Sequence, residues 1–371
     1  MALTATAHPC RLPAVILTRP TAPLALPSDV TELLARFGLT LPGLLTGANP
    51  KLSKGAALGH GAAVILHHLP ARALAAAVTT TTAHPVAARA HLPALAALAE
   101  AEGLTAAALA HMGCPWATRA CEAGCLNYSG RGGLGTGVAL ARGRRTLAMV
   151  ADPVTYGRAV LWAIGWQWRR AQAEALSLAV RLRGTDEGPR IGWHRLALTV
   201  TPAEAQALGR RFGLPVAPGE AVTLAEALAP ARAEGLTLYD YSKAPLTGPL
   251  GLQAQRAAGW DVTASLAADR ATAAADALAA LADGFRLAVP VALARGQALP
   301  RTLTLTAGGR TLQVPTVNGD LSDHRYREPG GVAVILRSKA SRGAGPEAAP
   351  FHLTPHGLPQ ELPDGVVTLG W

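Results

Sequence analysis

Strand-like and helix-like segments alternate along the second half of this chain, and that alternation constrains the fold more than any other feature. Short apolar runs are followed by segments that open on capping residues or close on glycine, and two of these segments open on predicted capping boxes, Thr201 to Glu204 and Thr223 to Glu226. Such βαβα alternation predicts a mainly parallel sheet covered by helices. The predicted strands of this part are residues 177–182, 236–242, 260–266 and 285–293, and the predicted helices are 201–213, 223–235 and 269–284.

Further apolar runs complete the predicted sheet. Residues 62–66 and 331–336 indicate two more core strands, and residues 301–307 and 310–317 indicate a small antiparallel hairpin turning at Gly308 and Gly309. Six or seven core strands favour a partial or full (β/α) barrel, with a doubly wound open sheet as the alternative.

The flanks of the chain differ from its middle. We expect a proline-rich lead with a short helix capped by Ser28 over residues 1–43, one barrel-like domain over 44–340, and a loosely ordered tail over 341–371. Half of the residues are apolar, so the 371-residue chain is long enough for a sizeable core.

The charge balance is compatible with an anionic partner. With 34 basic and 24 acidic residues the net charge is +10, which favours contact with phosphates or an anionic cofactor as much as it favours solubility. The sequence has no long block of like charge, which excludes a basic arm that grips nucleic acid by electrostatics alone.

Nothing in the sequence resembles a membrane span or a secretion signal. No apolar run reaches about 18 residues, and prolines at 9, 13, 20 and 23 interrupt the N-terminal stretch. We therefore expect a cytoplasmic protein. In a reducing compartment its four cysteines are interpreted first as metal ligands, catalytic thiols or buried thiols.

Three of the four cysteines gather in a loop within residues 111–145. Cys114, Cys121 and Cys125 follow the spacing C-x6-C-x3-C. Soft thiolates select zinc or iron–sulfur clusters, so this density favours a metal site over three small buried hydrophobic residues. A closed zinc site needs a fourth ligand, and His111 is the local candidate.

An iron–sulfur cluster is the other metal that suits the loop. Three cysteines on a [4Fe–4S] cluster leave one iron open, and S-adenosylmethionine is the ligand that best fits such a position. The adjacent Gly130, Gly132 and Gly135 allow backbone N–H groups to approach a carboxylate or phosphate closely. No strand precedes these glycines, so they do not make a dinucleotide-binding fingerprint.

Polar residues follow the predicted strands, where parallel sheets place their chemistry. An aspartate and a lysine at one edge can orient and protonate a substrate. Single residues of this kind also serve as helix caps or loop ion pairs. The candidates are Arg183 and Asp186 for a cofactor, and Asp240, Lys243, Asp320 and Asp323 as catalytic residues that face the substrate. Asp269 and Arg270 follow the next strand, and His324 and Arg325 accompany Asp320 and Asp323 before the last strand.

A row of aromatic residues lies in the long helical segment after Pro153. Trp162, Trp166 and Arg169 recur at helical spacing. The row is typical of an amphipathic face packed against a sheet, and a base-stacking platform is the alternative.

Five motifs together resemble those of a family of uncharacterised bacteriophage and prophage proteins, similar to the phage "gene product 88" family. The resemblance covers about residues 44–340. It is carried by LLTGANPKLSKG (44–55), CPWATRACEAGCLNYSGRG (114–132), VRLRGTDE (180–187), LYDYSKAP (238–245) and VNGDLSDHRY (317–326) ahead of GVAVILRSKA (331–340).

The family's CPxAxxxCxxxC loop looks like a relative of the radical-SAM cluster loop, which usually reads C-x3-C-x2-C. The resemblance therefore implies an iron–sulfur enzyme with a radical-SAM-like barrel, acting on a nucleotide or nucleic acid. Two other functional hypotheses stay open. One is a non-catalytic zinc module that binds nucleic acid or a host protein, and the other is a zinc-containing barrel that exchanges bases in nucleic acid.

Overall fold

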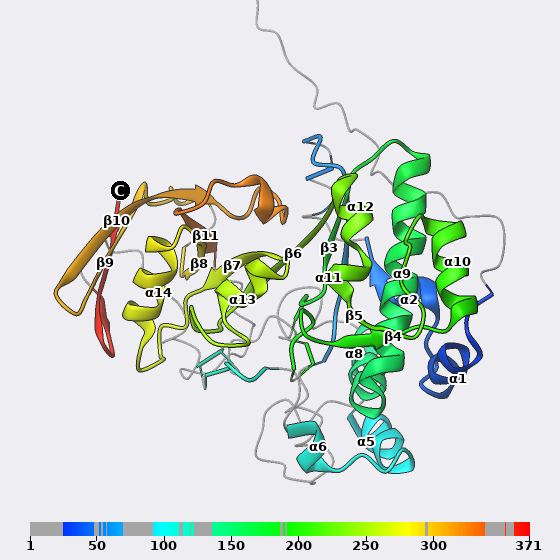
Figure 1. The fold of residues 1–371 in the computed structure, drawn as a ribbon. Coiled ribbons are helices and arrows are strands. Elements are labelled where there is room, and N and C mark those ends of the chain that lie inside the picture. The colour runs from blue at the N-terminus through cyan, green and yellow to red at the C-terminus, as the bar shows by residue number, and fades with distance from the viewer. Residues whose placement is uncertain are drawn as a thin grey trace, which may run out of the picture.

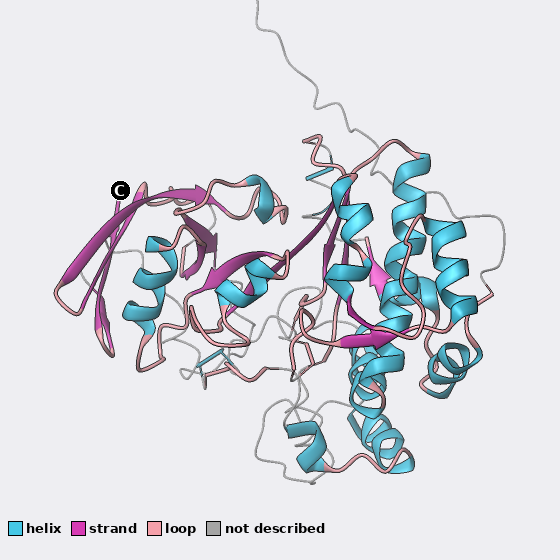
Figure 2. Ribbon diagram, viewed as in Figure 1, coloured by secondary structure: helices cyan, strands magenta, loops and turns pink. Residues whose placement is uncertain are grey.

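The computed structural model describes residues 25–47, 52, 55–56, 58–69, 92–110, 114–118, 120–121, 136–185, 188–189, 191–293, 296–337, 353 and 360–371. Within these ranges the protein is an α/β structure with one large mixed sheet (Figures 1 and 2). No described helix is long and apolar enough to cross a membrane.

The sheet has 11 strands, and its central part is parallel. Parallel pairing runs without interruption from β2 through β3, β6, β7, β8 and β11 to β10. In sheet order the strands are β1 (Leu45–Thr46), β2 (Ala62–Leu66), β3 (Leu178–Arg181), β6 (Leu236–Ser242), β7 (Asp261–Ser265), β8 (Arg286–Val291), β11 (Ala333–Arg337), β10 (Arg310–Asn318), β9 (Thr302–Ala307), β13 (Gly365–Gly370) and β12 (Gln360–Leu362).

The sheet is open in the described part of the chain, because its edge strands β1 and β12 do not pair with each other. The expectation of a full barrel is therefore wrong, whereas the α/β class with mainly parallel strands is confirmed. From β2 to β8 the strands follow chain order without the reversal that a doubly wound sheet requires. A separate ladder pairs β4 (Ala197–Thr199) with β5 (Ala221–Thr223).

The helices pack mostly on one face of the sheet, where α9 contacts β3, α12 contacts β6, α13 contacts β7, and α14 contacts β7 and β8. They are α1 (Ser28–Arg36), α2 (Leu41–Leu44), α5 (Leu92–Ala101), α6 (Ala106–Ala110), α8 (Thr136–Ala151), α9 (Pro153–Ala173), α10 (Pro202–Phe212), α11 (Leu224–Ala227), α12 (Ala229–Ala233), α13 (Leu252–Ala257) and α14 (Ala273–Ala282).

The side chains of successive strand residues point to opposite faces of the sheet, and each face has its own hydrophobic core. Val64 and Val180 belong to the large core, whereas Ile65 and Ala179, one residue away on the same strands, belong to a small second core with Tyr239. Because successive strand residues point to opposite faces, the second core lies on the other face of the sheet. The segment 319–328, which contains the 3-10 turn η3 (Arg325–Arg327), contacts β6 and β7 and brings Tyr326 to the second core.

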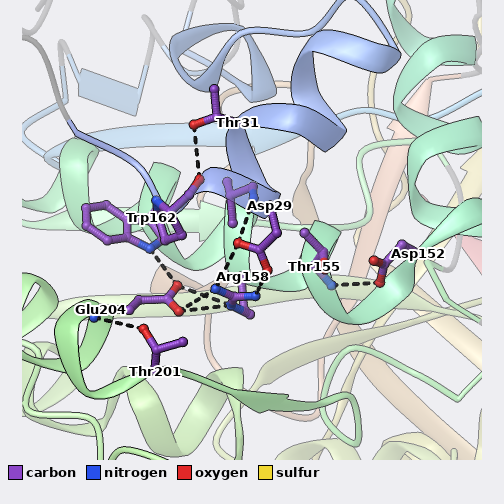
Figure 3. A network of polar contacts seen from close by, with 10 residues as sticks. Asp29, Thr31, Asp152, Thr155, Arg158, Trp162, Thr201 and Glu204 are labelled. Atoms are coloured by element: carbon purple, nitrogen blue, oxygen red, sulfur yellow. Dashed lines mark hydrogen bonds and ion pairs between the residues drawn. The ribbon is translucent and has the colours of Figure 1, made fainter.

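A buried ion network joins the helices (Figure 3). Arg158 of α9 binds the carboxylates of both Asp29 and Glu204, and its Nη2 lies 2.6 Å from Glu204 Oε2. The Trp162 indole donates to Glu204 Oε1 at 2.8 Å. Trp162 and Trp166 are both buried, which supports the packing interpretation and leaves Trp162 unavailable for stacking on a base.

The capping box expected at Thr201 is only half formed. Thr201 accepts a hydrogen bond from the Glu204 amide, but the Glu204 carboxylate turns to Arg158 and Trp162. The second expected box, from Thr223 to Glu226, is complete.

Residues 360–371 form ordered strands where a loosely ordered tail was expected over 341–371, and the rest of that range, apart from residue 353, lies outside the described residues. Strands β12 and β13 extend the predicted hairpin of β9 and β10, which turns at Gly308 and Gly309 with φ of 55° and 73°. Asp364, in the turn between β12 and β13, accepts from the amides of Ala274 and Ala275 at 2.8 and 2.9 Å. It thereby caps the N-terminus of α14.

Two other expectations need correction. The loop expected over 111–145 ends early, because residues from Thr136 onward form α8. Near the N-terminus, Ser28 is the first residue of α1 and Pro27 is the cap, without a side-chain hydrogen bond. The rest of the proline-rich lead, residues 1–24, lies outside the described residues.

Candidate functional site

The described part of the cysteine segment is fixed to the carboxyl edge of the parallel sheet by Asp269. This aspartate lies four residues beyond the end of β7. The Thr118 hydroxyl donates to its Oδ1 at 2.5 Å, and the Ala120 amide donates to its Oδ2 at 3.0 Å. Thr118 Oγ1 also accepts from the Cys121 amide at 3.2 Å. One carboxylate therefore sets the backbone that leads into Cys121.

Arg270 makes the second attachment. Its guanidinium donates to the carbonyl of Trp116 at 2.9 Å and to the carbonyl of Lys243 at 2.6 Å. Asp276 of α14 lies 3.5 Å from the same side chain. The segment between Cys114 and Cys121 is thus held against the ends of β6 and β7, as the expected clustering of strand ends predicts.

Of the predicted metal ligands, Cys114 and Cys121 lie within the described residues. Both are half-buried, and neither forms a disulfide. Thiols at the partly open edge of a sheet suit a metal that exchanges ligands with the solvent side. The other predicted ligands, Cys125 and His111, and the glycines at 130, 132 and 135 lie outside the described residues. Within those residues, no three His, Cys, Asp or Glu side chains are grouped to hold a metal ion.

Arg181, at the end of β3, joins two of the predicted catalytic carboxylates. Its Nη1 donates to Asp323 at 2.9 Å, and its Nε lies 4.0 Å from Asp240. The guanidinium also lies over the Tyr241 ring, 4.4 Å from the centroid, and the Tyr241 hydroxyl lies 3.4 Å from Asp323. Burial disfavours the charge, but the attraction of Asp323 together with Tyr241, Tyr239 and Asp240 outweighs burial and raises the pKa of Arg181. Arg181 therefore remains a cation at this edge.

Asp240 is fully buried and accepts two hydrogen bonds, from the Arg183 amide at 2.8 Å and from the Trp260 indole at 3.1 Å. Burial raises the pKa of its carboxyl to about 6, against the opposing charges of Arg183 and Arg181. Such a carboxyl changes its protonation near neutral pH, which is the property required of an acid or base.

Because the pKa of Asp240 is raised in the folded protein, the free energy of unfolding should fall as the pH rises. Between about pH 4 and pH 6 the folded protein holds a proton on Asp240 that the unfolded chain has released, so stability falls as pH rises through this window. We expect wild-type protein to lose about 2–3 kcal/mol of unfolding free energy across the window relative to Asp240→Asn. Urea unfolding at a series of pH values measures this difference. Parallel pH profiles for the two proteins would contradict the assignment.

The other predicted site residues lie in different surroundings. Arg183 is buried, and its Nη1 donates to Gln255 Oε1 at 2.6 Å. Lys243 lines a small pocket together with Ser242, Ser265, Arg270 and Asp276. Asp320 lies apart from Asp240 and instead accepts from the Arg337 amide at the end of β11. Asp186 lies outside the described residues.

No family model, curated protein or solved structure gives a significant match to this chain. The function must therefore be argued from the site itself.

Sequence reasoning missed several residues of this region. Arg181 ends an otherwise apolar strand, and its charge at that position was the sequence signal that could have identified it as a site residue. His67 follows β2, and burial followed by the charges of Arg142 and Arg181 lowers its pKa to about 3, so it is neutral. Gln255 and Trp260 come from the α13 region, where nothing in the sequence pointed to the site.

Proposed function

We propose that this protein is a cytoplasmic iron–sulfur enzyme of phage type, built on an open, radical-SAM-like half-barrel, that acts on a nucleotide or nucleic acid. The observation that carries the proposal is the attachment of the Cys114–Cys121 segment to the carboxyl edge of the sheet by Asp269 and Arg270. Parallel sheets place their active sites at this edge.

In this proposal Cys114, Cys121 and Cys125 hold a [4Fe–4S] cluster, and the glycines at 130, 132 and 135 with Arg183 and Asp186 contact S-adenosylmethionine. When bound, a three-cysteine cluster supplies an electron and one open iron position. The sequential order from β2 to β8 supports a half-barrel, because strands in chain order curve one way around a single interior.

The chain's own residues account for substrate binding. Lys243, whose carbonyl shares Arg270 with the cysteine segment, and Arg181 at the end of β3 provide positive charge, which suits the phosphates of a nucleotide. Asp240 and Asp323 share Arg181, whose positive charge favours the ionised form of both carboxylates. Asp320 lies farther along the edge and is proposed to contact a more distant part of the substrate.

Anaerobic purification tests the proposal directly. We expect a brown protein with about four irons and matching sulfide per chain. Cys121→Ala should abolish both colour and iron, whereas Cys10→Ala, outside the loop, should retain them. A colourless protein with one zinc would favour the non-catalytic zinc module instead. A protein that retains neither metal would mean that the cysteines are structural thiols.

A further inference from the structure

A second pair of possible metal ligands, His60 and His324, lies beside Tyr326 and the second core on the other face of the sheet. His324 is fully buried, and its Nδ1 lies 2.9 Å from the Tyr326 hydroxyl. That hydroxyl also lies 3.1 Å from the His60 carbonyl oxygen, which can only accept. A hydroxyl has one proton to give, so the His324 Nδ1 must be the donor to Tyr326. The Nε2 of His324 is then unprotonated and carries a free lone pair.

This lone pair accepts no hydrogen bond from any described residue. Both His324 Nε2 and His60 Nδ1 are buried atoms without a hydrogen-bond partner among the described residues. Buried polar atoms of this kind are rare and require an explanation such as a water or an ion. Burial lowers the pKa of both imidazoles, that of His324 to about 4, so both rings are neutral.

The separation of the two rings matches shared coordination. Their centroids lie 5.3 Å apart, with the ring planes tilted by 57°. Two imidazoles bound to one tetrahedral ion, with metal–nitrogen bonds of about 2.0–2.1 Å, have ring centres about 5 Å apart. The hydrogen bond from His324 Nδ1 to Tyr326 orients the His324 ring, as second-shell partners of metal-bound histidines do, and Tyr326 in turn holds the His60 backbone.

Gly55 packs closely against the His324 ring. A Cβ atom at residue 55 would lie 2.5 Å from His324 Nε2, closer than any side chain tolerates. The Gly55 carbonyl accepts from the His60 amide at 3.0 Å, so the same turn that contacts the His324 ring also positions His60. His60 as a residue is half-buried, and its Nδ1 is buried.

We infer that His60 and His324 together bind a divalent transition-metal ion such as Ni²⁺ or Zn²⁺, with the remaining coordination positions filled by water or by a substrate atom. Imidazole nitrogen is a preferred ligand of these ions. This site is separate from the cysteine loop and does not depend on the proposed function.

Calorimetric titration of the chelator-treated full chain with Ni²⁺ tests this inference. Wild-type protein should bind one more Ni²⁺ than His60→Asn and His324→Asn. The matched control is His194→Asn, because His194 is also buried with an unpartnered Nδ1 but lies beside Pro249 rather than another histidine. It should bind as the wild type does.

Gly55→Ala provides a second test that keeps both histidines, and it should weaken binding at the site at least tenfold. If His324→Asn does not fold, His60→Asn decides, because His60 is half-buried in a turn. Identical titrations for wild type and His60→Asn would overturn the inference, as would a loss of binding in His194→Asn equal to that in His60→Asn.

Discussion

Replacing Asp269 with alanine should weaken metal retention by about 10–100-fold although no ligand is changed. Asp269 accepts from the Thr118 hydroxyl and the Ala120 amide, and Thr118 in turn accepts from the Cys121 amide. Without this carboxylate the cysteine segment loses the contacts that set the direction of Cys121. Its thiol would then have to be ordered when the metal binds.

The measurement is the amount of iron that remains after timed exposure to a chelator. Asp283→Ala is the matched control, since Asp283 pairs with Arg256 on the surface, away from the cysteine segment. It should retain iron as the wild type does. If Asp269→Ala is folded by circular dichroism and loses iron no faster than the control, the carboxylate does not position the cysteines.

The largest loss of stability is expected for Glu204→Ala, at about 3–5 kcal/mol of unfolding free energy. The substitution leaves the buried Arg158 guanidinium with only the half-exposed Asp29, and it removes the acceptor of the Trp162 indole (Figure 3). An incompletely paired buried charge costs far more than a lost surface contact. Urea unfolding followed by tryptophan fluorescence measures the change.

Asp29→Ala serves as the comparison within the same network. The Asp29 side chain is 51% exposed, against 1% for Glu204. Its removal should cost about 1 kcal/mol or less, because solvent screens the pair and Arg158 retains Glu204. Equal costs for the two variants would show that Arg158 is stabilised mainly by something other than Glu204.

The strands were predictable because their sequence signals are local. Residues 62–66 and 236–242 match β2 and β6 residue for residue, since each is an apolar or β-branched run that follows a glycine or a helix end. The pairing of β10 with β11, by contrast, depends on where the whole hairpin docks. No local pattern specifies that choice, nor whether the sheet closes.

Helix α8 was missed because its glycines suggest a loop. Gly143 lies inside the helix, and a Cβ there would lie 2.2 Å from Leu95 Cδ1. The residue permits α5 and α8 to pack closely, so it serves tertiary structure at the expense of helix propensity. A glycine selected by a neighbour in space cannot be distinguished from a helix-ending glycine along one sequence.

The candidate site was predictable in outline only. Strand ends identify Asp240, Asp269 and Arg270 because the carboxyl ends of parallel strands meet at one edge. The contacts that connect them do not follow from the sequence, since the choice of Arg181 as partner for Asp323 spans 142 residues. His60 lies in a turn and belongs to no sequence motif, so its position beside His324 becomes apparent only in the folded protein.

The order in which the chain is synthesised gives the C-terminal strands a particular importance. Strand β9 pairs with β10 on one side, and its other side is covered only by β13. Until residues 365–370 have been made, β9 is therefore an exposed edge, and the first turn of α14 lacks the Asp364 cap. Open edges invite pairing with other chains. A nascent or truncated protein without residues 360–371 should thus be prone to self-association at the edge that β13 covers.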